Sequence, residues 1–295
     1  MKMTIQQINN MNNDDEYFAL PALSASQIKQ FNEGGCGAYR FWQSSPLNPN
    51  KKTNADKDAS DALVFGKLAH CMLLEPEELE KRFVVADWGA KGRDTAAYRK
   101  FIKDFPDDRI VVSSEEWERA GTMIASLRGH KLAASIISGA TTELPIVWRD
   151  DQTGLLMKCK VDAIKRTKNG IVVIDYKTSG EMESFIKWPH KNSYYLQDAV
   201  YRQAIFEKYG EYPSEFVFIM QSKKPDEEEM IAILRYCMED VEYAKDRARY
   251  LIDTIAEKYK QWLETKDDSI WQPYPNIIEL HLSQWITNKQ AEEEI

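Results

Sequence analysis

The chain has 295 residues, and its 43% hydrophobic content is ample for a sizeable core in one large domain or two small ones. No run of roughly 18 apolar residues exists, which excludes a membrane-spanning helix, and the N-terminus lacks the charged-then-apolar pattern of a signal peptide. From these two features we expect a cytoplasmic protein without a membrane partner. A formal net charge of −8 excludes a uniformly basic nucleic-acid-binding protein.

The predicted elements begin after a flexible lead over residues 1–19. Ser24 can cap a helix that starts directly after it, and the glycine-rich segment 34–37 breaks that helix. A loop rich in Pro, Asn and Lys precedes an apolar helix that carries Gly66 and, one turn later, His70. The glycine is expected to let this helix approach a neighbouring element closely.

The second half of the chain contains the strand candidates. The four expected strands are residues 142–148, 155–164, 171–177 and 216–221. They form a meander and then a crossover through a helix that carries Gln197 and Tyr201, four residues apart on one face. The remaining expected elements are an exposed loop at 88–93, a helix at 115–127 and an amphipathic helix at 241–263, which packs against the sheet or a sister subunit.

Two aspartates lie at matching places in one strand pair. Asp162 ends one apolar strand, and after a hairpin signal at Asn169-Gly170 the chain returns along a second strand to Asp175. Asp175 and Lys177 are two residues apart, so an extended strand points both side chains to one face. Carboxylate oxygens suit Mg²⁺, and a lysine beside the metal can orient or help deprotonate an attacking water. The strand pair therefore predicts a metal-dependent nuclease site.

Each of these residues also has an ordinary structural interpretation. Asp-x-Lys on a strand is most often a solvated face with a surface ion pair. A lone histidine in an apolar helix, such as His70, is most often a core residue. Glu143, on the preceding strand, could join the site but is interpreted as a surface side chain. The order G-x-x-x-H, Asp, Asp-x-Lys and Gln-x-x-x-Tyr is nevertheless far more specific than any one of its parts.

That order resembles the PD-(D/E)XK nuclease superfamily, its RecB-like branch, and most closely the phage and prophage RecE-type (exonuclease VIII) recombination exonucleases. The likeness covers residues 20–285 and includes the segments LSASQIKQF, FGKLAH and WRDDQTGLLMKCKVDAI and the aromatic pair Phe41-Trp42. It implies an α/β restriction-endonuclease-like fold, in which a mixed central β-sheet is flanked by α-helices and carries the active site at its edge.

The resemblance also implies a role for each candidate residue. The catalytic residues that it assigns are Asp162, Asp175, Lys177, Gln197 and Tyr201. The metal-binding residues that it assigns are His70, Asp162 and Asp175. Gln197 and Tyr201 would flank the scissile phosphate. One departure is that Asp175 stands where the superfamily often has glutamate, which leaves a shorter ligand that still coordinates metal.

The implied activity is a Mg²⁺-dependent exodeoxyribonuclease, with Mn²⁺ as a substitute metal. It would degrade linear double-stranded DNA from 5′ to 3′ and leave 3′ single strands for phage-type recombination in a bacterial host cell. Its expected partners are double-stranded DNA ends, a single-strand annealing protein of the RecT type and further copies of the chain in a homo-oligomer. Two alternatives stay open: a RecB-like or Cas4-like nuclease acting on single-stranded DNA, and a catalytically silent DNA-binding protein on the same fold.

A single nuclease domain is expected over residues 20–287, followed by an acidic tail over 288–295. The net negative charge does not oppose DNA binding, because basic residues crowd the strand pair and the segment after it; the alternative is that they protect a strand edge. These residues are Lys158, Lys160, Lys165, Arg166, Lys168, Lys177, Lys187 and Lys191. The four cysteines lie far apart without the late group that holds an iron–sulfur cluster in some RecB-like nucleases, so we expect reduced thiols and no cluster.

Overall fold

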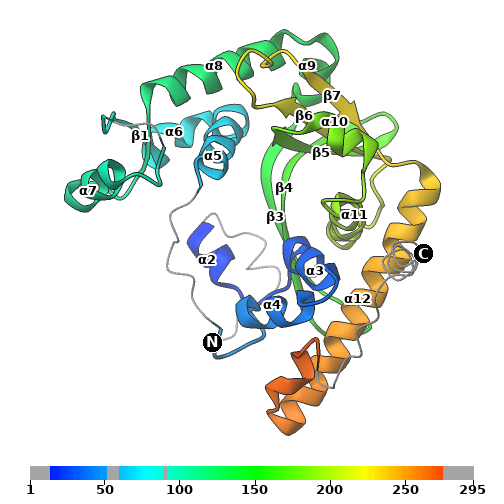
Figure 1. The fold of residues 1–295 in the computed structure, drawn as a ribbon. Helices are drawn as coiled ribbons and strands as arrows, with labels where there is room; N and C mark the ends of the chain where they lie inside the picture. Colours follow the sequence, from blue (N-terminus) through cyan, green and yellow to red (C-terminus); the bar gives the residue numbers. More distant parts are fainter. Residues whose placement is uncertain (1–13, 52–59, 90–91, 275–295) are drawn as a thin grey trace, which may run out of the picture.

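The chain folds around a five-stranded β-sheet with helices on both faces (Figure 1). The structure is a computed structural model and describes residues 14–51, 60–89 and 92–274. The strands, in their order across the sheet, are β3 (Thr141–Arg149), β4 (Leu156–Thr167), β5 (Gly170–Ser179), β6 (Glu215–Ser222) and β7 (Ile231–Leu234). Neighbouring strands are antiparallel except β5 and β6, which are parallel. The expected mixed α/β architecture is therefore confirmed.

Helices precede, connect and follow the strands. Those before the sheet are α2 (Asp14–Ala19), α3 (Ala25–Asn32), α4 (Gly37–Ser44), α5 (Asp61–Leu74), η1 (Pro76–Glu78), α6 (Leu79–Arg82), α7 (Ala96–Asp104), α8 (Ser114–Gly129) and α9 (Lys131–Ile137). Those that follow β5 are α10 (Met182–Lys187), α11 (Tyr194–Tyr209), α12 (Met238–Thr265) and η2 (Asp268–Trp271). Two short strands, β1 (Phe83–Val85) and β2 (Ile110–Val112), pair in parallel as a separate sheet.

The four strands expected from the sequence are present as β3, β4, β5 and β6. The crossover between the parallel strands β5 and β6 runs through α11, as expected. The hairpin between β4 and β5 closes at Gly170. Its φ of 116° favours glycine, and a Cβ atom added there would lie only 3.3 Å from Ser214. Strand β7 was not expected from the sequence. It has only four residues, which is too short for an alternation of apolar and polar side chains to be recognised.

Each face of the sheet has its own apolar core. On one face, α3, α4, α11 and α12 supply buried residues such as Trp42 and Leu196; on the other, α5, α8 and α9 supply residues such as Phe65 and Met123 (Figure 1). Gly66 brings α5 close to the sheet, because an added Cβ would lie 3.3 Å from Oγ1 of Thr178 on β5. The expected close approach of this helix is confirmed.

The N-terminal region is more ordered than expected. Of the segment 1–19, which was expected to be a flexible lead, residues 1–13 lie outside the described residues, and residues 14–19 form helix α2 with Tyr17 buried. Nζ of Lys158 donates to three main-chain carbonyl oxygens at the end of α2, at 3.0 to 3.1 Å. A buried ammonium therefore caps this helix against the sheet. The expected acidic tail lies outside the described residues.

The loop expected to be exposed at 88–93 is so only in part: Gly89 is exposed, residues 90–91 lie outside the described residues, and Arg93 is buried. Arg93 is only 3% exposed and pairs with Glu116 at 2.7 Å and with Asp61 at 2.9 Å. Its side chain thereby joins the starts of α5 and α8, so this arginine is a structural element of the fold. None of the helices in the described part of the chain combines the length and apolar character needed to cross a membrane.

Helix α12 packs on other helices of the same chain. Its apolar stripe, from Val241 to Trp262, is buried mainly against α11, α3 and η2, and less against the sheet. The alternative contact with a sister subunit stays a prediction. Beyond its end, Trp271 stacks on Trp42 of α4, with ring centroids 4.6 Å apart and planes 5° apart. Oδ1 of Asp268 accepts hydrogen bonds from the indole nitrogens of Trp42 at 2.8 Å and Trp262 at 2.9 Å. We call Trp42, Trp262, Trp271 and Asp268 the tryptophan clasp.

The clasp predicts a strong stability effect of Asp268. Asp268→Ala leaves two indole N–H groups without their acceptor, so we expect the free energy of unfolding to fall by about 3 kcal/mol. Asp267→Ala is the matched control, because Asp267 is exposed like Asp268 but only caps η2 through Ser269, and its loss should cost about 1 kcal/mol. Urea denaturation of both variants measures the difference. Equal losses would show that the clasp does not contribute beyond an ordinary cap.

Candidate functional site

The candidate site forms where strands β4 and β5 separate. Their antiparallel ladder runs from the hairpin turn to the pair of Ala163 and Ile174. Asp162 and Asp175 are the next residues along, so they stand opposite each other where the ladder ends. Both strands are inner strands of the sheet, so the expectation of a site at the sheet's edge was wrong.

A third carboxylate lies in the same row across the sheet. The ladder between β3 and β4 pairs the neighbours of Glu143 with the neighbours of Asp162, which places these two residues opposite each other. The backbone of Glu143 has a φ of 53°, a left-handed conformation that costs a residue other than glycine about 1 kcal/mol or more. Its side chain is 12% exposed, so the interpretation of Glu143 as a surface residue was wrong.

Asp175 is fully buried and is held by two side chains. Oδ1 forms an ion pair with Nζ of Lys177, which lies on the same face of β5, as the two-residue spacing predicts. Oδ2 accepts a hydrogen bond from Nε2 of Gln197 on α11. The hydroxyl of Tyr201, one turn later, donates to the main-chain carbonyl of Lys160 at 3.2 Å. The structure thus brings Gln197 to the carboxylate and Tyr201 to the backbone of β4.

His70 approaches Asp162 from the opposite layer. Its Nε2 lies 3.0 Å from Oδ2 of Asp162, and its Nδ1 lies 3.4 Å from Oε1 of Glu143. The main-chain N–H of Tyr176 also donates to Oδ2 of Asp162 at 2.9 Å. Nζ of Lys160 pairs with the other oxygen of Glu143 at 2.7 Å. His70 is therefore part of a polar cluster and not simply a core residue of α5.

The buried charges shift the pKa values of the cluster in opposite directions. Burial and the charge of Asp162 raise the pKa of Asp175 to about 6, although Lys177 opposes this. Burial would also raise the pKa of Asp162, but the hydrogen bond from His70 and the charge of Lys177 outweigh it and hold that pKa below its ordinary value. Burial lowers the pKa of His70, while Asp162 and Glu143 raise it above its ordinary value by a larger amount. The arrangement thus separates the two aspartates into one readily ionised and one less readily ionised carboxyl.

Three side chains of the cluster suit a divalent cation. One ligand atom each from His70, Glu143 and Asp162 can be chosen so that all lie within 4.8 Å of one another. Oε1 of Glu143 is buried and accepts no hydrogen bond from any residue that the structure describes. Two carboxylates and an imidazole form a reasonable donor set for Mg²⁺ or Mn²⁺. Asp175, which the sequence placed among the ligands, lies outside this group and is engaged by Lys177 and Gln197.

The space left by the separated strands is partly filled by the N-terminal segment. Leu23 donates its N–H to the carbonyl of Leu156 at 2.8 Å and accepts from the N–H of Lys158 at 2.7 Å, so this segment takes the place that β5 has left. A cavity of about 500 Å³ remains between α3, β4 and α11, and Asp162, Lys177, Gln197 and Tyr201 line it. A second cavity of about 470 Å³ lies beside α5, and Lys177 and His70 line it. The cluster therefore stands between two cavities that a polymer strand could occupy.

Three of the lysines on β4 and β5 are held by oxygen atoms within or next to the site. Lys158, Lys160 and Lys177 are bound by main-chain carbonyls, by Glu143 and by Asp175 respectively. Because β4 and β5 are inner strands, the alternative that their lysines protect a strand edge was wrong. The acidic chain thus has locally basic walls around its acidic cluster.

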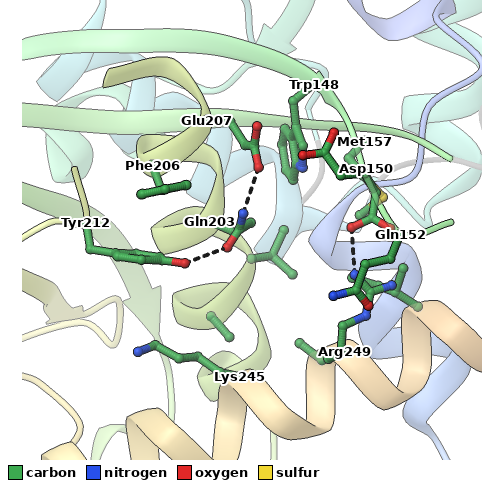
Figure 2. A pocket seen from close by; sticks show the side chains of 15 residues that line it. Trp148, Asp150, Gln152, Met157, Gln203, Phe206, Glu207, Tyr212, Lys245 and Arg249 are labelled. Atoms are coloured by element: carbon green, nitrogen blue, oxygen red, sulfur yellow. Dashed lines mark hydrogen bonds and ion pairs between the residues drawn. The ribbon is translucent and has the colours of Figure 1, made fainter. Parts of the chain in front are cut away.

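A further pocket lies away from this cluster. It has a volume of about 340 Å³ and is lined by Trp148, Arg249, Lys245 and the opposite face of α11, including Gln203 and Phe206 (Figure 2). Arg249 pairs there with Asp150 at 2.6 Å, and Gln203 is bonded to Glu207 and Tyr212. Arg249, Asp150 and Glu207 therefore already have partners within the pocket, and the pocket contains no member of the candidate site.

Three residues of the site were not assigned to it from the sequence. Glu143 was interpreted as a surface side chain, Lys160 was named only among the basic residues, and Lys29 was not singled out. Glu143 and Lys160 could have been found by extending the hairpin register, because Glu143 is opposite Asp162 and Lys160 is two residues earlier on the same strand. Lys29 lies in the LSASQIKQF segment and lines the cavity, but nothing in the local sequence shows that this segment lies against β4.

Comparison with known proteins found one family model and a similar solved structure. Residues 24–263 match the family model described as "PDDEXK-like domain of unknown function (DUF3799)". A solved structure described as "Putative exonuclease" from Eubacterium rectale is similar with a TM-score of 0.53 and 14% identity, over 99% of each chain. At that identity the likeness shows a shared fold alone. No curated protein matches the chain.

The family model spans most of the chain, from the start of α3 almost to the end of α12, and includes every residue of the cluster. The chain belongs to the PDDEXK-like family DUF3799.

Proposed function

We propose that the chain is a metal-dependent nuclease, and specifically an exonuclease that degrades linear double-stranded DNA. The observation that carries the proposal is the convergence of Asp162, Asp175, Lys177 and His70 at one point between two cavities. Membership of a PDDEXK-like family supports a nuclease, and the fold is shared with a protein described as an exonuclease. Digestion from 5′ to 3′, a RecT-type annealing partner, a homo-oligomer and a role in recombination belong to the same proposal and rest on the sequence resemblance.

A divalent cation fits the cluster. Asp162, Glu143 and His70 would hold it, and the buried Oε1 of Glu143, without a hydrogen bond of its own, is the atom that most needs such a partner. Mg²⁺ is the proposed ion, because oxygen ligands predominate. When bound, the cation would polarise a phosphodiester and stabilise the negative charge that develops on it.

The chain's own residues supply orientation and charge. Lys177 is held as an ammonium by Asp175 and places a fixed positive charge beside the cavity where a phosphate would lie. Gln197 fixes the carboxylate that holds this lysine. Tyr201 anchors β4 two residues before Asp162, so that the metal-binding carboxylate keeps its position at the end of the ladder. These contacts exist before any substrate binds, so the site is organised in advance.

The experiment that tests the proposed function compares DNA forms at matched salt with Mg²⁺ present. We expect rapid digestion of linear duplex DNA and no digestion of the same duplex closed into a circle, because an exonuclease requires an end. Label at the 5′ or the 3′ end gives the polarity. Digestion of the closed circle contradicts an exonuclease, and digestion of single strands alone favours the RecB-like or Cas4-like alternative. Absence of cleavage with Mg²⁺ and Mn²⁺ favours the silent DNA-binding protein.

Substitutions in the cluster are expected to act as one unit. Asp162→Asn, Asp175→Asn and Lys177→Gln should each lower kcat by at least about a hundredfold, because each removes charge from a preorganised site. The double variant of both aspartates should be no slower than the slower single variant. Lys103→Gln, at an exposed position of α7, is the control, because it removes a lysine that lines neither cavity, and it should cleave normally. A wild-type rate for Asp175→Asn with Mg²⁺ present would end this assignment.

The metal ligands can be tested without activity. Mg²⁺ or Mn²⁺ should raise the Tm of the wild-type protein, since a ligand that binds only the folded state stabilises it. His70→Ala and Glu143→Gln should each need at least about tenfold more metal for the same rise. Glu211→Gln, which alters only an exposed ion pair with Arg166, serves as the control. A lower Tm for His70→Ala with an unchanged metal titration would instead make His70 a core residue.

A further inference from the structure

Lys29 differs from the other lysines that line the cavity, because it has no hydrogen-bond or ion-pair partner in the described part of the chain. Lys29 lies on α3, is partly buried and lines the cavity together with Asp162 and Lys177. It forms no hydrogen bond or ion pair with any residue between 14 and 274 that the structure describes. Its Nζ lies 4.7 Å from the ring centroid of Tyr194, which also faces Nζ of Lys177 at 5.4 Å. Two ammonium groups thus share one aromatic ring, and only Lys177 has a carboxylate partner.

This arrangement is unfavourable in the free protein. Removing an ammonium from water without an anion costs free energy, and a second cation nearby adds repulsion. Both effects lower the pKa of Lys29 to about 8, burial being the larger, although the charge of Asp175 acts the other way. The contact with the tyrosine ring offsets part of this cost. An anion bound beside Lys29 would supply the counter-charge that this partly buried cation lacks.

The surroundings of Lys29 restrict the anion that could bind. Helix α3 begins at the cavity, where Ser24, Ala25 and Ser26 line the wall, so the positive end of its dipole faces the same space. The cavity opens onto the separated strands, next to Asp162, and its volume of about 500 Å³ is large enough for a nucleotide unit. The other lysines that line the cavity are already bound to protein oxygens. Among the described lysines of this wall, Lys29 is the one available to a new anion.

We propose that Lys29 binds a phosphodiester of the substrate strand next to the one that is cleaved, and so positions the strand in this cavity. This inference rests on the proposed nuclease function. It adds a direction for the substrate strand, which would continue from the cluster into the cavity that Lys29 lines. Lys29 would orient the strand, and it is not one of the three residues that suit the metal. The phosphate supplies the counter-charge that the free protein lacks.

The first measurement is the stability of the protein without DNA. A lysine that only stabilises the fold lowers the Tm when it is removed, whereas removal of an unpaired cation beside Lys177 leaves the Tm equal or higher. We therefore expect Lys29→Met to melt at or above the wild-type temperature. The matched control is Lys245→Met, because Lys245 is also a partly buried lysine over a tyrosine ring, at 5.3 Å from Tyr212, but it has Glu242 as partner at 2.7 Å (Figure 2). The control should melt at or below the wild-type temperature.

The second measurement is the salt dependence of binding to a short duplex oligonucleotide in EDTA, where no cleavage occurs. Loss of one phosphate contact should weaken binding about tenfold. It should also reduce the slope of log K against log salt by about 0.7 to 0.9. Lys29→Arg, which keeps the charge, should retain the wild-type slope, and Lys245→Met should have the wild-type slope and affinity. A role in packing alone would change the affinity without changing the slope.

The outcomes separate this inference from the proposed function. An unchanged salt slope in Lys29→Met, or a clearly lower Tm, overturns the phosphate contact even if the wild-type protein is an active nuclease. Conversely, a wild-type protein that cleaves nothing but shows the slope change keeps the phosphate contact and loses the nuclease function. Failure of the wild-type protein to bind DNA at any salt concentration overturns both.

Discussion

Two acidic side chains that face each other inside a sheet must be neutralised, and this requirement at Asp162 and Asp175 organises the surrounding structure. Like charges this close cannot both remain ionised in a low-dielectric interior without compensation. Each carboxylate receives different partners: Lys177 and Gln197 hold Asp175 from the α11 side, and His70 and the N–H of Tyr176 hold Asp162. The helical layers on both faces of the sheet are therefore tied to one point.

The separation of β4 from β5 has consequences for the chain far from the aspartates. The open side of β4 is occupied by Leu23, which fixes the start of α3, and Lys158 on the same strand caps α2. The N-terminal helices thus become walls of a cavity whose floor is the sheet. An overall charge of −8 is compatible with such a site, because the local charge at the cavity and not the total decides what can bind.

The sequence was most informative where the contacts are local. Asp162, Asp175 and Lys177 belong to one hairpin, so the alternation of strands and the turn at Gly170 are sufficient to bring them together. His70 is about a hundred residues earlier, and only the order of motifs indicated its position. Glu143 was misjudged because its left-handed backbone and its burial depend on packing against α5. Arg93, Lys29 and the packing of α12 on α11 were missed for the same reason, since each depends on segments distant in sequence.

The tryptophan clasp joins the two ends of the described chain, since Trp42 of α4 stacks on Trp271 after α12. During synthesis on a ribosome, α3 and α4 emerge long before their final packing partner exists. Until η2 has been translated, α4, which packs on α3, lacks its contact with Trp271. A nascent chain therefore carries Asp162 and Asp175 before α12 and η2 exist. A product truncated before η2 would keep these sheet residues but would lack the packing of Trp271 on Trp42.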